Sequence, residues 1–407
     1  MLQKISWTFS ANVISAAVKW LLLVAIAQIL TPIDVGDYAL ALAIASPITL
    51  FANMKLRSLY VTSKEEDFRS FATVRNIVFA CSLVILMGLS FFYDAWLIVL
   101  LVGISKLLDC TSDLLYAVPH KAQEMKKIAL LILYKQLGII VLFTATLFAT
   151  NSLRWSLVAM VVFQLIYVLI ERKSCLHSIQ TVPFSSKRVR LILLMGIPLG
   201  VTQLIVSFNS FLPRYGLAYF ATAEEVGYFS AVSYVTVVVN IVMGAVAQNY
   251  IHTLKEQFSK GNTSRLHKIL YVDLFKIALV LSVSLLIGVI VFGKLFLTLA
   301  YGESYAAYNT LLILLIGCIF FNCLNWNIDT AYMAFGFVKS QLPLTLFATI
   351  LSIPLTLLLI SNYSLWGAGI AMITNSFILY VCKDIFLRRM FRKEQQTEKA
   401  VQTKVIK

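Results

Sequence analysis

The sequence predicts an all-α integral membrane protein with about twelve transmembrane helices. They are expected to form two parallel six-helix bundles, related by a pseudo-two-fold axis along the membrane normal. Three observations predict this fold class. The composition is too apolar for a soluble protein, apolar runs of membrane-spanning length recur along the chain, and one pattern of polar residues opens both halves.

The composition places the chain in a membrane. Of its 407 residues 60% are apolar and only 13% are charged, and the mean hydropathy is +0.85. The six Cys have no paired or metal-like spacing, which is typical of small buried hydrophobes. No Gly-rich segment ends in Gly-Lys-Ser or Gly-Lys-Thr, so nucleotide-driven transport by this chain is not expected. We expect no cofactor, no metal site and no catalytic residue.

A membrane-spanning helix needs about 20 predominantly apolar residues. Twelve segments of this kind follow one another, so both termini are expected on the same side. The predicted spans are 9–30, 38–61, 72–92, 96–118, 128–149, 154–171, 191–219, 226–250, 269–292, 308–334, 342–360 and 365–386.

Lys and Arg predict the orientation, because cytoplasmic connectors are enriched in them. When residues near the ends of spans are counted with the side they adjoin, 27 of the 34 Lys and Arg residues fall on the side that holds both termini, two (Arg154 and Lys294) on the other side, and five deep inside spans. Both termini are therefore expected in the cytoplasm. The net charge of +15 follows from this topology, and it favours attraction to anionic membrane lipids over nucleic acid binding.

Four parts are predicted along the chain. They are an N-terminal six-helix bundle (1–171), a cytoplasmic linker (172–190), a C-terminal six-helix bundle (191–386) and a basic cytoplasmic tail (387–407). The tail is polar and basic, so we expect it to be frayed or disordered.

A stripe of polar residues opens each predicted bundle. The two stripes are Thr8, Asn12, Ser15, Lys19 and Gln203, Ser207, Ser210, Arg214. Their spacing of four, three and four places each stripe on one helix face. Each is followed by a Val-Gly dipeptide, Val35-Gly36 or Val226-Gly227. A charge inside hydrocarbon costs about 2.5–3.5 kcal/mol, so Lys19 and Arg214 are expected to face protein or water.

The repeat extends to two further pairs of spans. The fourth and tenth spans share one spacing, in Lys106, Asp109, Asp113, Tyr116 and in Asn322, Asn325, Asp329, Tyr332. The second and eighth share another, in Ser46, Thr49, Asn53 (continued by Arg57) and in Ser233, Thr236, Asn240, four residues out of register with the Val-Gly match. Such polar faces either line a substrate site between two halves or hydrogen-bond helix to helix. We expect Lys106 and Asp109 to pair locally.

Several stretches then identify a family. They are Gly196-Ile197-Pro198-Leu199-Gly200, Leu212-Pro213-Arg214-Tyr215, Glu225-Val226-Gly227-Tyr228-Phe229-Ser230-Ala231, Leu30-Thr31-Pro32 with Val35-Gly36-Asp37-Tyr38, and Lys121-Ala122-Gln123-Glu124-Met125. With them the chain resembles the bacterial polysaccharide and O-antigen flippases. That family belongs to the multidrug/oligosaccharidyl-lipid/polysaccharide exporter superfamily, which also holds multidrug and toxin extruders and the lipid II flippase.

The resemblance implies two bundles facing a central cavity in the bacterial cytoplasmic (inner) membrane. It implies alternating access that moves undecaprenyl-diphosphate-linked oligosaccharide for O-antigen (lipopolysaccharide), capsule or exopolysaccharide biosynthesis. The expected partners are this lipid-linked oligosaccharide, membrane lipids, and the polysaccharide polymerase and chain-length machinery. Where the first span of the family often has a buried Arg, this chain has Lys19, which lacks the bidentate fork of Arg.

Roles follow for the polar positions. Cations that replace water around the diphosphate are expected at Lys19, Arg57 and Arg214. Hydroxyl and amide side chains that meet the sugars are expected at Asn12, Ser15, Gln203, Ser207 and Ser210. Possible proton-coupling carboxylates are Asp109, Asp113 and Asp329.

Two other functions stay open. A multidrug or cation extruder of the same superfamily would need carboxylates without a cation partner, and Asp109, Asp113 and Asp329 are candidates. A membrane glycan polymerase or ligase would need an outward catalytic loop, and no predicted outward connector is long enough for one.

Overall fold

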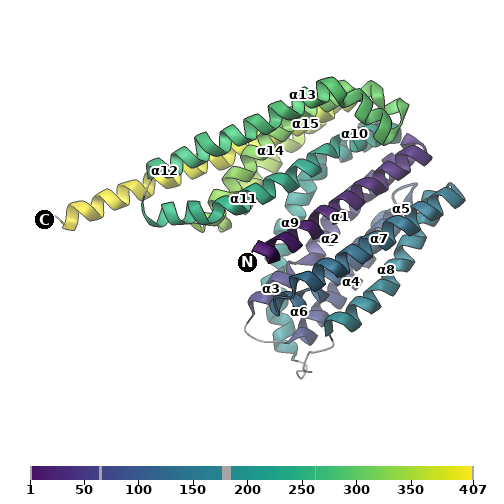
Figure 1. The fold of residues 1–407 in the computed structure, drawn as a ribbon, viewed down its shortest axis with the longest axis horizontal. Coiled ribbons are helices and arrows are strands. Elements are labelled where there is room, and N and C mark those ends of the chain that lie inside the picture. Colours follow the sequence, from purple (N-terminus) through teal and green to yellow (C-terminus); the bar gives the residue numbers. More distant parts are fainter. Residues whose placement is uncertain (1, 64–66, 177–184, 262, 406–407) are drawn as a thin grey trace. The chain divides into compact units, whose positions relative to one another are not determined.

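The computed structural model describes residues 2–63, 67–176, 185–261 and 263–405, and no strand occurs within these ranges. Ten α-helices make up the first part of the chain, drawn from purple to teal in Figure 1. They are α1 (Leu2–Ile29), α2 (Pro32–Asn53), α3 (Leu56–Thr62), α4 (Phe68–Ser90), α5 (Trp96–Leu115), α6 (Ala117–Lys121), α7 (Met125–Thr150), α8 (Leu153–Leu176), α9 (Ser186–Phe220) and α10 (Ala223–Ser233).

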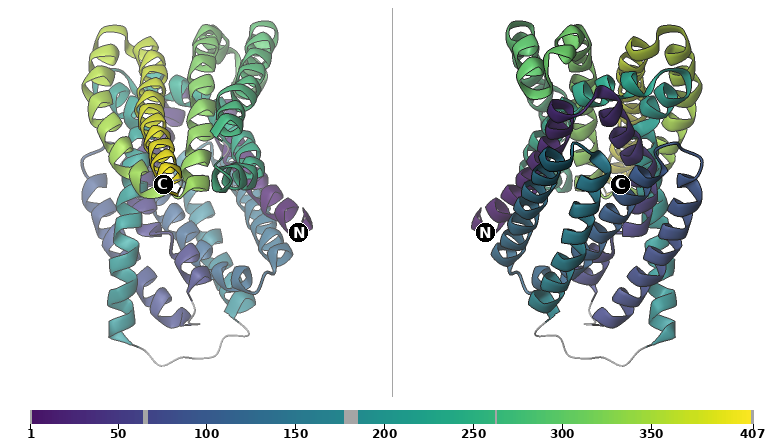
Figure 2. Two further views of the ribbon diagram at one scale, coloured as in Figure 1. Left: turned by 90° about the vertical axis from the view of Figure 1, so that its left-hand side faces the viewer. Right: turned by 90° about the vertical axis from the view of Figure 1, so that its right-hand side faces the viewer.

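The rest of the described chain is also helical. It consists of α11 (Val235–Ser259), α12 (Thr263–Lys268), the π-helix η1 (Ile269–Asp273), α13 (Leu274–Tyr301), the 3-10 helix η2 (Glu303–Tyr308), α14 (Asn309–Phe335) and α15 (Val338–Val405). The last two predicted spans both lie in α15, which is interrupted at Ser364 (φ 46°, ψ −123°). The halves before and after Ser364 run back past each other (Figure 2), and the side chains of Thr356 and Asn375 hydrogen-bond across them.

The C-terminal tail is helical to Val405, where the sequence predicts fraying. Arg388 donates to Asp384 one turn earlier, with 2.7 Å between Nε and Oδ2. Glu, Gln, Lys and Arg, which make up more than half of the tail, are also good helix formers, so the helix extends.

Nine helices within the described ranges are long and apolar enough to cross a membrane. The fourth predicted span is not among them because α5 carries three charges, Lys106, Asp109 and Asp113. The eighth is divided between α10 and α11, and the last two are counted together in α15. Helices thus occur at all twelve predicted spans.

The helices pack into two compact units, which we describe separately. The first comprises Met1–Ala231 with Ala300–Gly302, and the second Val232–Leu299 with Glu303–Lys407. In the first unit α1 packs on α7, α7 on α8, and α8 on α5 (Figure 1). The helix α9 packs against α2 and α4 of this unit. The predicted linker 172–190 includes 177–184, outside the described residues, so the predicted bundle boundary stays a prediction.

The helix α9 completes the hydrogen bonding of α2. Pro47 lies inside α2 and has no N–H to give to the carbonyl of Ala43. The hydroxyl of Tyr215, on α9, donates to that carbonyl instead. Near the end of α2 the amide of Gln203 donates to the carbonyl of Leu50 at 3.2 Å. Since unpaired main-chain carbonyls are costly, these two bonds fix the position of α9 on α2.

The end of α2 is held by a buried arginine. Met54 and Lys55 both adopt left-handed backbone conformations (φ 47° and 49°), which break the helix before α3 begins. Arg75, only 2% exposed, donates to the carbonyls of Ala52 at 2.7 Å and Asn53 at 3.1 Å. These carbonyls would otherwise be unpaired helix-end acceptors, so Arg75 stabilises the break.

The first turns of α2 and α10 meet at two glycines. A Cβ on Gly36 would lie 1.9 Å from the carbonyl oxygen of Ala223, and one on Gly227 would lie 2.0 Å from that of Pro32. Each carbonyl belongs to the residue four positions before the opposing glycine, so the contact is reciprocal. The two Val-Gly dipeptides therefore occupy equivalent places, as the sequence repeat predicts.

The helix starts next to this contact are also equivalent. Thr31 and Asp34 form a capping box at α2, with Asp34 N 3.4 Å from Thr31 Oγ1 and Thr31 N 3.1 Å from Asp34 Oδ2. Thr222 and Glu225 form the same box before α10, at 3.2 Å and 3.3 Å. Such boxes satisfy helix-end N–H groups and set where each helix begins. They support the register of the Val-Gly match.

In the second unit α14 packs against α11 and α15. Tyr332 is fully buried, and its hydroxyl donates to the carbonyl of Lys383 at 3.0 Å. Phe258 stacks on Phe335, with 4.4 Å between ring centroids. These contacts tie the end of α14 to both neighbours.

Candidate functional site

Charged side chains gather inside the first unit, on helices that the sequence predicts to span the membrane. We call Lys19, Lys106, Asp109, Lys135 and Glu171 the lysine–carboxylate cluster; they come from α1, α5, α7 and α8. Charges at membrane depth are costly and are kept where they serve a substrate or ion path. The cluster is therefore the candidate functional site.

Asp109 pairs with a lysine from another helix. The Nζ of Lys135 lies 2.8 Å from Oδ1 of Asp109, and the lysine is almost fully buried. The amide of Gln164 donates to the same oxygen at 3.4 Å. The predicted local pair of Lys106 with Asp109 does not form, and Lys135 of α7 pairs with Asp109 instead. This prediction was wrong.

Glu171 ends the cluster at α8 and is completely buried. Both of its carboxylate oxygens accept hydrogen bonds, one from the hydroxyl of Ser112 and one from that of Tyr116. Ser112 in turn accepts a hydrogen bond from Lys135, with 2.8 Å between Oγ and Nζ. A continuous network therefore joins Asp109 to Glu171 through Lys135 and Ser112.

Two further lysines, Lys19 and Lys106, act on Asp109. The charge of Lys19 acts on both Lys106 and Asp109, so the three groups are close. Within the described residues neither lysine has a hydrogen-bond or ion-pair partner. Lys19 is exposed and Lys106 half-buried. Together with Lys135 they give the cluster three ammonium groups around Asp109.

Sequence reasoning missed two members of this network. Glu171 is the last residue of the predicted sixth span, where it reads as the start of the polar connector. Lys135 is visible as a cation inside a span, but its partner lies 26 positions away on another helix. The available signal was that an unpaired Lys inside hydrocarbon requires a carboxylate on a neighbouring span.

Arg57, from α3, is bonded to two polar side chains. Its Nη1 lies 3.2 Å from Oδ1 of Asp113, and its Nε donates to Nδ1 of His120 at 3.1 Å. Asn53 donates to the other oxygen of Asp113 at 3.4 Å. The structure thus joins a predicted phosphate-binding cation to a predicted coupling carboxylate. Arg57 is held by protein groups here.

His120 lies in α6, after the predicted fourth span. Burial and the charge of Arg57 lower the pKa of His120 below its usual 6.5, although Asp113 acts in the opposite direction. Its Nδ1 accepts the Arg57 hydrogen bond, which requires that nitrogen to be unprotonated. Neutral His120 therefore belongs to this arrangement.

The first-span stripe lies only partly in contact with its unit. Asn12 is exposed, as is Lys19. Ser15 accepts a hydrogen bond from Gln136 of α7 at 3.3 Å. The side chain of Thr8 is outside the described part of the structure. Asn12 and Lys19 therefore remain open to a ligand, while Ser15 joins α1 to α7.

The four residues of the seventh-span stripe differ in exposure and in hydrogen-bond partners. Ser210 is exposed and donates to the carbonyl of Val206, and Gln203 is bonded to α2 as described above. Ser207 is buried, and its hydroxyl has no partner within the described residues. Arg214 donates from Nε to Ser230 at 3.0 Å and lies over the ring of Phe211, 5.0 Å from its centroid. Arg214 is therefore already engaged.

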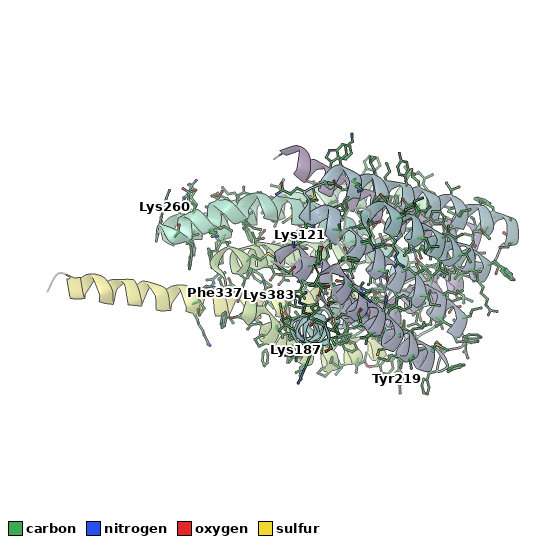
Figure 3. The ribbon with its side chains drawn as sticks, turned by 90° about the horizontal axis from the view of Figure 1, so that it is seen from below. Lys121, Lys187, Tyr219, Lys260, Phe337 and Lys383 are labelled. Atoms are coloured by element: carbon green, nitrogen blue, oxygen red, sulfur yellow. The ribbon has the colours of Figure 1, made fainter. Side chains whose placement is uncertain are left out.

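Asp329 lies in the second unit and is also paired. Lys383, labelled in Figure 3, places its Nζ 2.8 Å and 2.9 Å from the two carboxylate oxygens. Gln341 donates to Oδ1 at 3.4 Å. Asp109, Asp113 and Asp329 thus each have a cation partner, and each partner comes from a different helix.

Comparison with known proteins places the chain among polysaccharide biosynthesis proteins. Residues 1–251 match the model of a family described as "Polysaccharide biosynthesis protein". The capsular polysaccharide biosynthesis protein CapF of Staphylococcus aureus is 24% identical over 402 residues, which cover 96% of this chain and 100% of that protein.

Solved structures of transporters share the fold. The lipid II flippase MurJ in an inward closed conformation has a TM-score of 0.75 at 13% identity, over 94% of this chain and 87% of that one. An inward-facing multidrug resistance MATE family transporter of the MOP superfamily has a TM-score of 0.68 at 13% identity, over 97% and 96%. These likenesses confirm the fold class that the sequence predicts.

Proposed function

Because this chain belongs to the family of polysaccharide biosynthesis proteins, we propose that it is a flippase for undecaprenyl-diphosphate-linked oligosaccharide in the cytoplasmic membrane of a bacterium. It works by alternating access, without a covalent step, and supplies O-antigen, capsule or exopolysaccharide synthesis. The match to CapF over almost the whole chain supports a surface polysaccharide, and the likeness to MurJ and a MATE transporter supports a transporter. Both termini lie in the cytoplasm, and the flipped glycan passes to a polymerase with its chain-length machinery.

The observation that carries this proposal is the charge of the lysine–carboxylate cluster. Lys135 neutralises Asp109, so Lys19 and Lys106 are two cations without a protein partner within the described residues. A diphosphate diester carries roughly two negative charges and binds ammonium groups well. Two free ammonium groups from α1 and α5 match that charge. Lys106 thus joins Lys19 as a head-group cation.

The cations lower the main barrier to transport. Each elementary charge that moves through 100 mV gains about 2.3 kcal/mol, so roughly two charges leaving a negative cell interior gain about 4–5 kcal/mol. The obstacle is the removal of water from the phosphates at membrane depth. Lys19 and Lys106 replace part of that hydration with charge-assisted hydrogen bonds.

The other predicted ligands join the site in different ways. Asn12 is exposed on the face of α1 that carries Lys19, so it is free to contact sugars. Arg57 and Arg214 reach the diphosphate only after leaving Asp113, His120 or Ser230. Ser15, Gln203, Ser207 and Ser210 are the other proposed sugar contacts.

A cation extruder is less well supported by the site. Such a transporter needs carboxylates that a cationic substrate can reach, and Asp109, Asp113 and Asp329 each already face a cation of the protein. The lysine–carboxylate cluster holds three ammonium groups against two carboxylates, which repels a cationic drug.

Reconstituted vesicles test the proposed function. Purified protein is placed in liposomes that hold an undecaprenyl-diphosphate-linked oligosaccharide, and a membrane-impermeant glycosidase reports the share of glycan on the outer leaflet. We expect protein-dependent exposure of the glycan that a membrane potential accelerates. Parallel vesicles with cationic dyes give no uptake. Dye transport with no glycan movement would instead establish the extruder.

A further inference from the structure

Lys135 stands between two carboxylates and touches only one of them directly. Its Nζ donates to Asp109 and to the hydroxyl of Ser112, and that hydroxyl donates to Glu171. We propose that Lys135, Ser112 and Glu171 form a proton-transfer switch, which sets whether Asp109 pairs with Lys135 or with Lys19 and Lys106. This inference rests on the proposed function, because the switch then sets whether the diphosphate is held or released.

The hydrogen bonds run in one direction. Lys135 is a donor only, Ser112 accepts from it and donates onward, and Glu171 accepts. A proton leaves Nζ of Lys135 for Oγ of Ser112 while the Ser112 proton moves to Oε2 of Glu171. One N–H bond of Lys135 breaks and one O–H bond forms on Glu171. Ser112 gives up its own proton and receives the proton of Lys135, so it remains a hydroxyl. The products are a neutral amine and a neutral carboxylic acid, and the total charge is unchanged.

Burial favours the neutral state of the pair. Lys135 is 3% exposed and Glu171 0%, and burial disfavours the charged form of both groups. Direct contact with Asp109 favours charged Lys135, while Glu171 has hydroxyl donors but no direct cation. The transfer removes two buried charges, and this gain opposes the loss of the Lys135–Asp109 ion pair.

The transfer changes the partners of Asp109. When Lys135 is neutral, the nearest remaining cations that act on Asp109 are Lys19 and Lys106. These two lysines then turn toward Asp109 and are withdrawn from the diphosphate. When Lys135 is charged, it satisfies Asp109 and releases both lysines for the substrate. Lys135, Ser112 and Glu171 are therefore positioning residues that act through Asp109.

The residues that surround Glu171 come from α5, α6, α7 and α8. From α5 it faces Asp109, Ser112 and Tyr116, and from α7 it faces Lys135. On α8 its neighbours are Tyr167, whose hydroxyl donates to the carbonyl of Leu131, and Cys175. From α6, His120 is bonded to Arg57 and Lys121 donates to the carbonyl of Ser63. Lys135 is thus the basic group that the network connects to Glu171.

Two substitutions give opposite forecasts for diphosphate binding, measured on the purified full-length protein with the soluble probe farnesyl diphosphate. Lys135→Met imitates the neutral lysine, so Asp109 captures Lys19 and Lys106, and affinity falls about 5- to 150-fold. Glu171→Gln cannot take the proton, so Lys135 stays charged. Affinity is then kept or raised, while glycan translocation in vesicles slows. Glu256 is an exposed carboxylate outside the lysine–carboxylate cluster, so Glu256→Gln is the matched control. It should change neither the affinity for the probe nor the rate of glycan translocation.

A spectroscopic signal tests the proton itself. Infrared difference spectra of the wild type should show loss of a protonated-carboxyl band when the probe binds, and Glu171→Gln should lack this signal. Ser112→Ala keeps both charges but breaks the path, so it should behave like Glu171→Gln. If that variant and Glu171→Gln keep normal turnover, or if Lys135→Met binds the probe normally, the switch is wrong while the proposed function stands. Failure of the wild type to bind the probe would count against the proposed function instead.

Discussion

Gly36 and Gly227 lie against each other at the first turns of α2 and α10, and each occupies the space where the other helix presents a carbonyl oxygen. The two residues are equivalent in the sequence repeat and follow equivalent capping boxes. A backbone carbonyl cannot rotate away as a side chain can. Glycine is therefore required at both positions while these helices are in contact.

We predict that Gly36→Ala or Gly227→Ala separates these helices and lowers stability by about 1–3 kcal/mol, the usual cost of overpacking. The measurement is thermal unfolding of the detergent-purified protein. Gly88→Ala is the control, because nothing lies within 4 Å of a Cβ at that position of α4. Equal unfolding temperatures for the Gly36 and Gly88 variants would contradict the close contact.

The second prediction concerns the hydrogen bond from the Tyr215 hydroxyl to the carbonyl of Ala43 in α2. Tyr215→Phe leaves the carbonyl of Ala43 unpaired and should cost about 1–3 kcal/mol. The loss should shrink in a Pro47→Ala background, because an alanine at that position restores the N–H that pairs this carbonyl within α2. A double-mutant cycle on unfolding in detergent measures the coupling. Additive losses would show that Tyr215 has another role.

The third prediction concerns the stability of the protein at low pH. The pKa of His120 lies below 6.5 in the folded protein, so the unfolded chain takes up the proton first as pH falls. Stability from the Arg57–His120 bond is thus present above about pH 6.5 and is lost on acidification below it. His120→Asn keeps an acceptor for Arg57 but does not titrate. It should remove this part of the pH dependence of unfolding, and an unchanged acid profile would refute the assignment.

The fourth prediction concerns Asp329 and Lys383. Asp329→Asn leaves a buried ammonium group without its carboxylate, which typically costs about 3–5 kcal/mol. Asp329→Asn with Lys383→Met should be less destabilised than Asp329→Asn alone. Unfolding and membrane protein level report both variants. Normal stability of Asp329→Asn together with impaired translocation would support the coupling role instead.

The helices were largely predictable because long apolar runs are visible in the sequence alone. The break in α15 was predictable as well, because the predicted spans end at 360 and begin again at 365, on either side of Ser364. The break after α2 was not, because the left-handed residues Met54 and Lys55 lie inside a predicted span, and the carbonyls before them are paired by Arg75 on another helix. The Val-Gly repeat was a better guide to register than the polar stripes, because close backbone contact tolerates only glycine.

The candidate site was predictable in its residue types but not in its pairs. The spacing of Lys106 and Asp109 suggests a local ion pair, yet Asp109 is bonded to Lys135 on α7. Arg57 reads as a free phosphate-binding cation, yet it is held by Asp113 and His120. Which cation pairs with which carboxylate depends on how the helices pack, and the residue pattern of a single sequence does not show that packing.

The central claim is that Lys19 and Lys106 hold the diphosphate, and paired measurement of surface glycan and membrane protein level tests it most directly. Lys19→Ala and Lys106→Ala should each abolish or severely reduce surface glycan while the protein inserts normally. Lys294 is an exposed lysine of α13, so Lys294→Ala is the matched control and should leave surface glycan unchanged. Normal surface glycan in both the Lys19 and Lys106 variants, at normal protein level, would contradict the account.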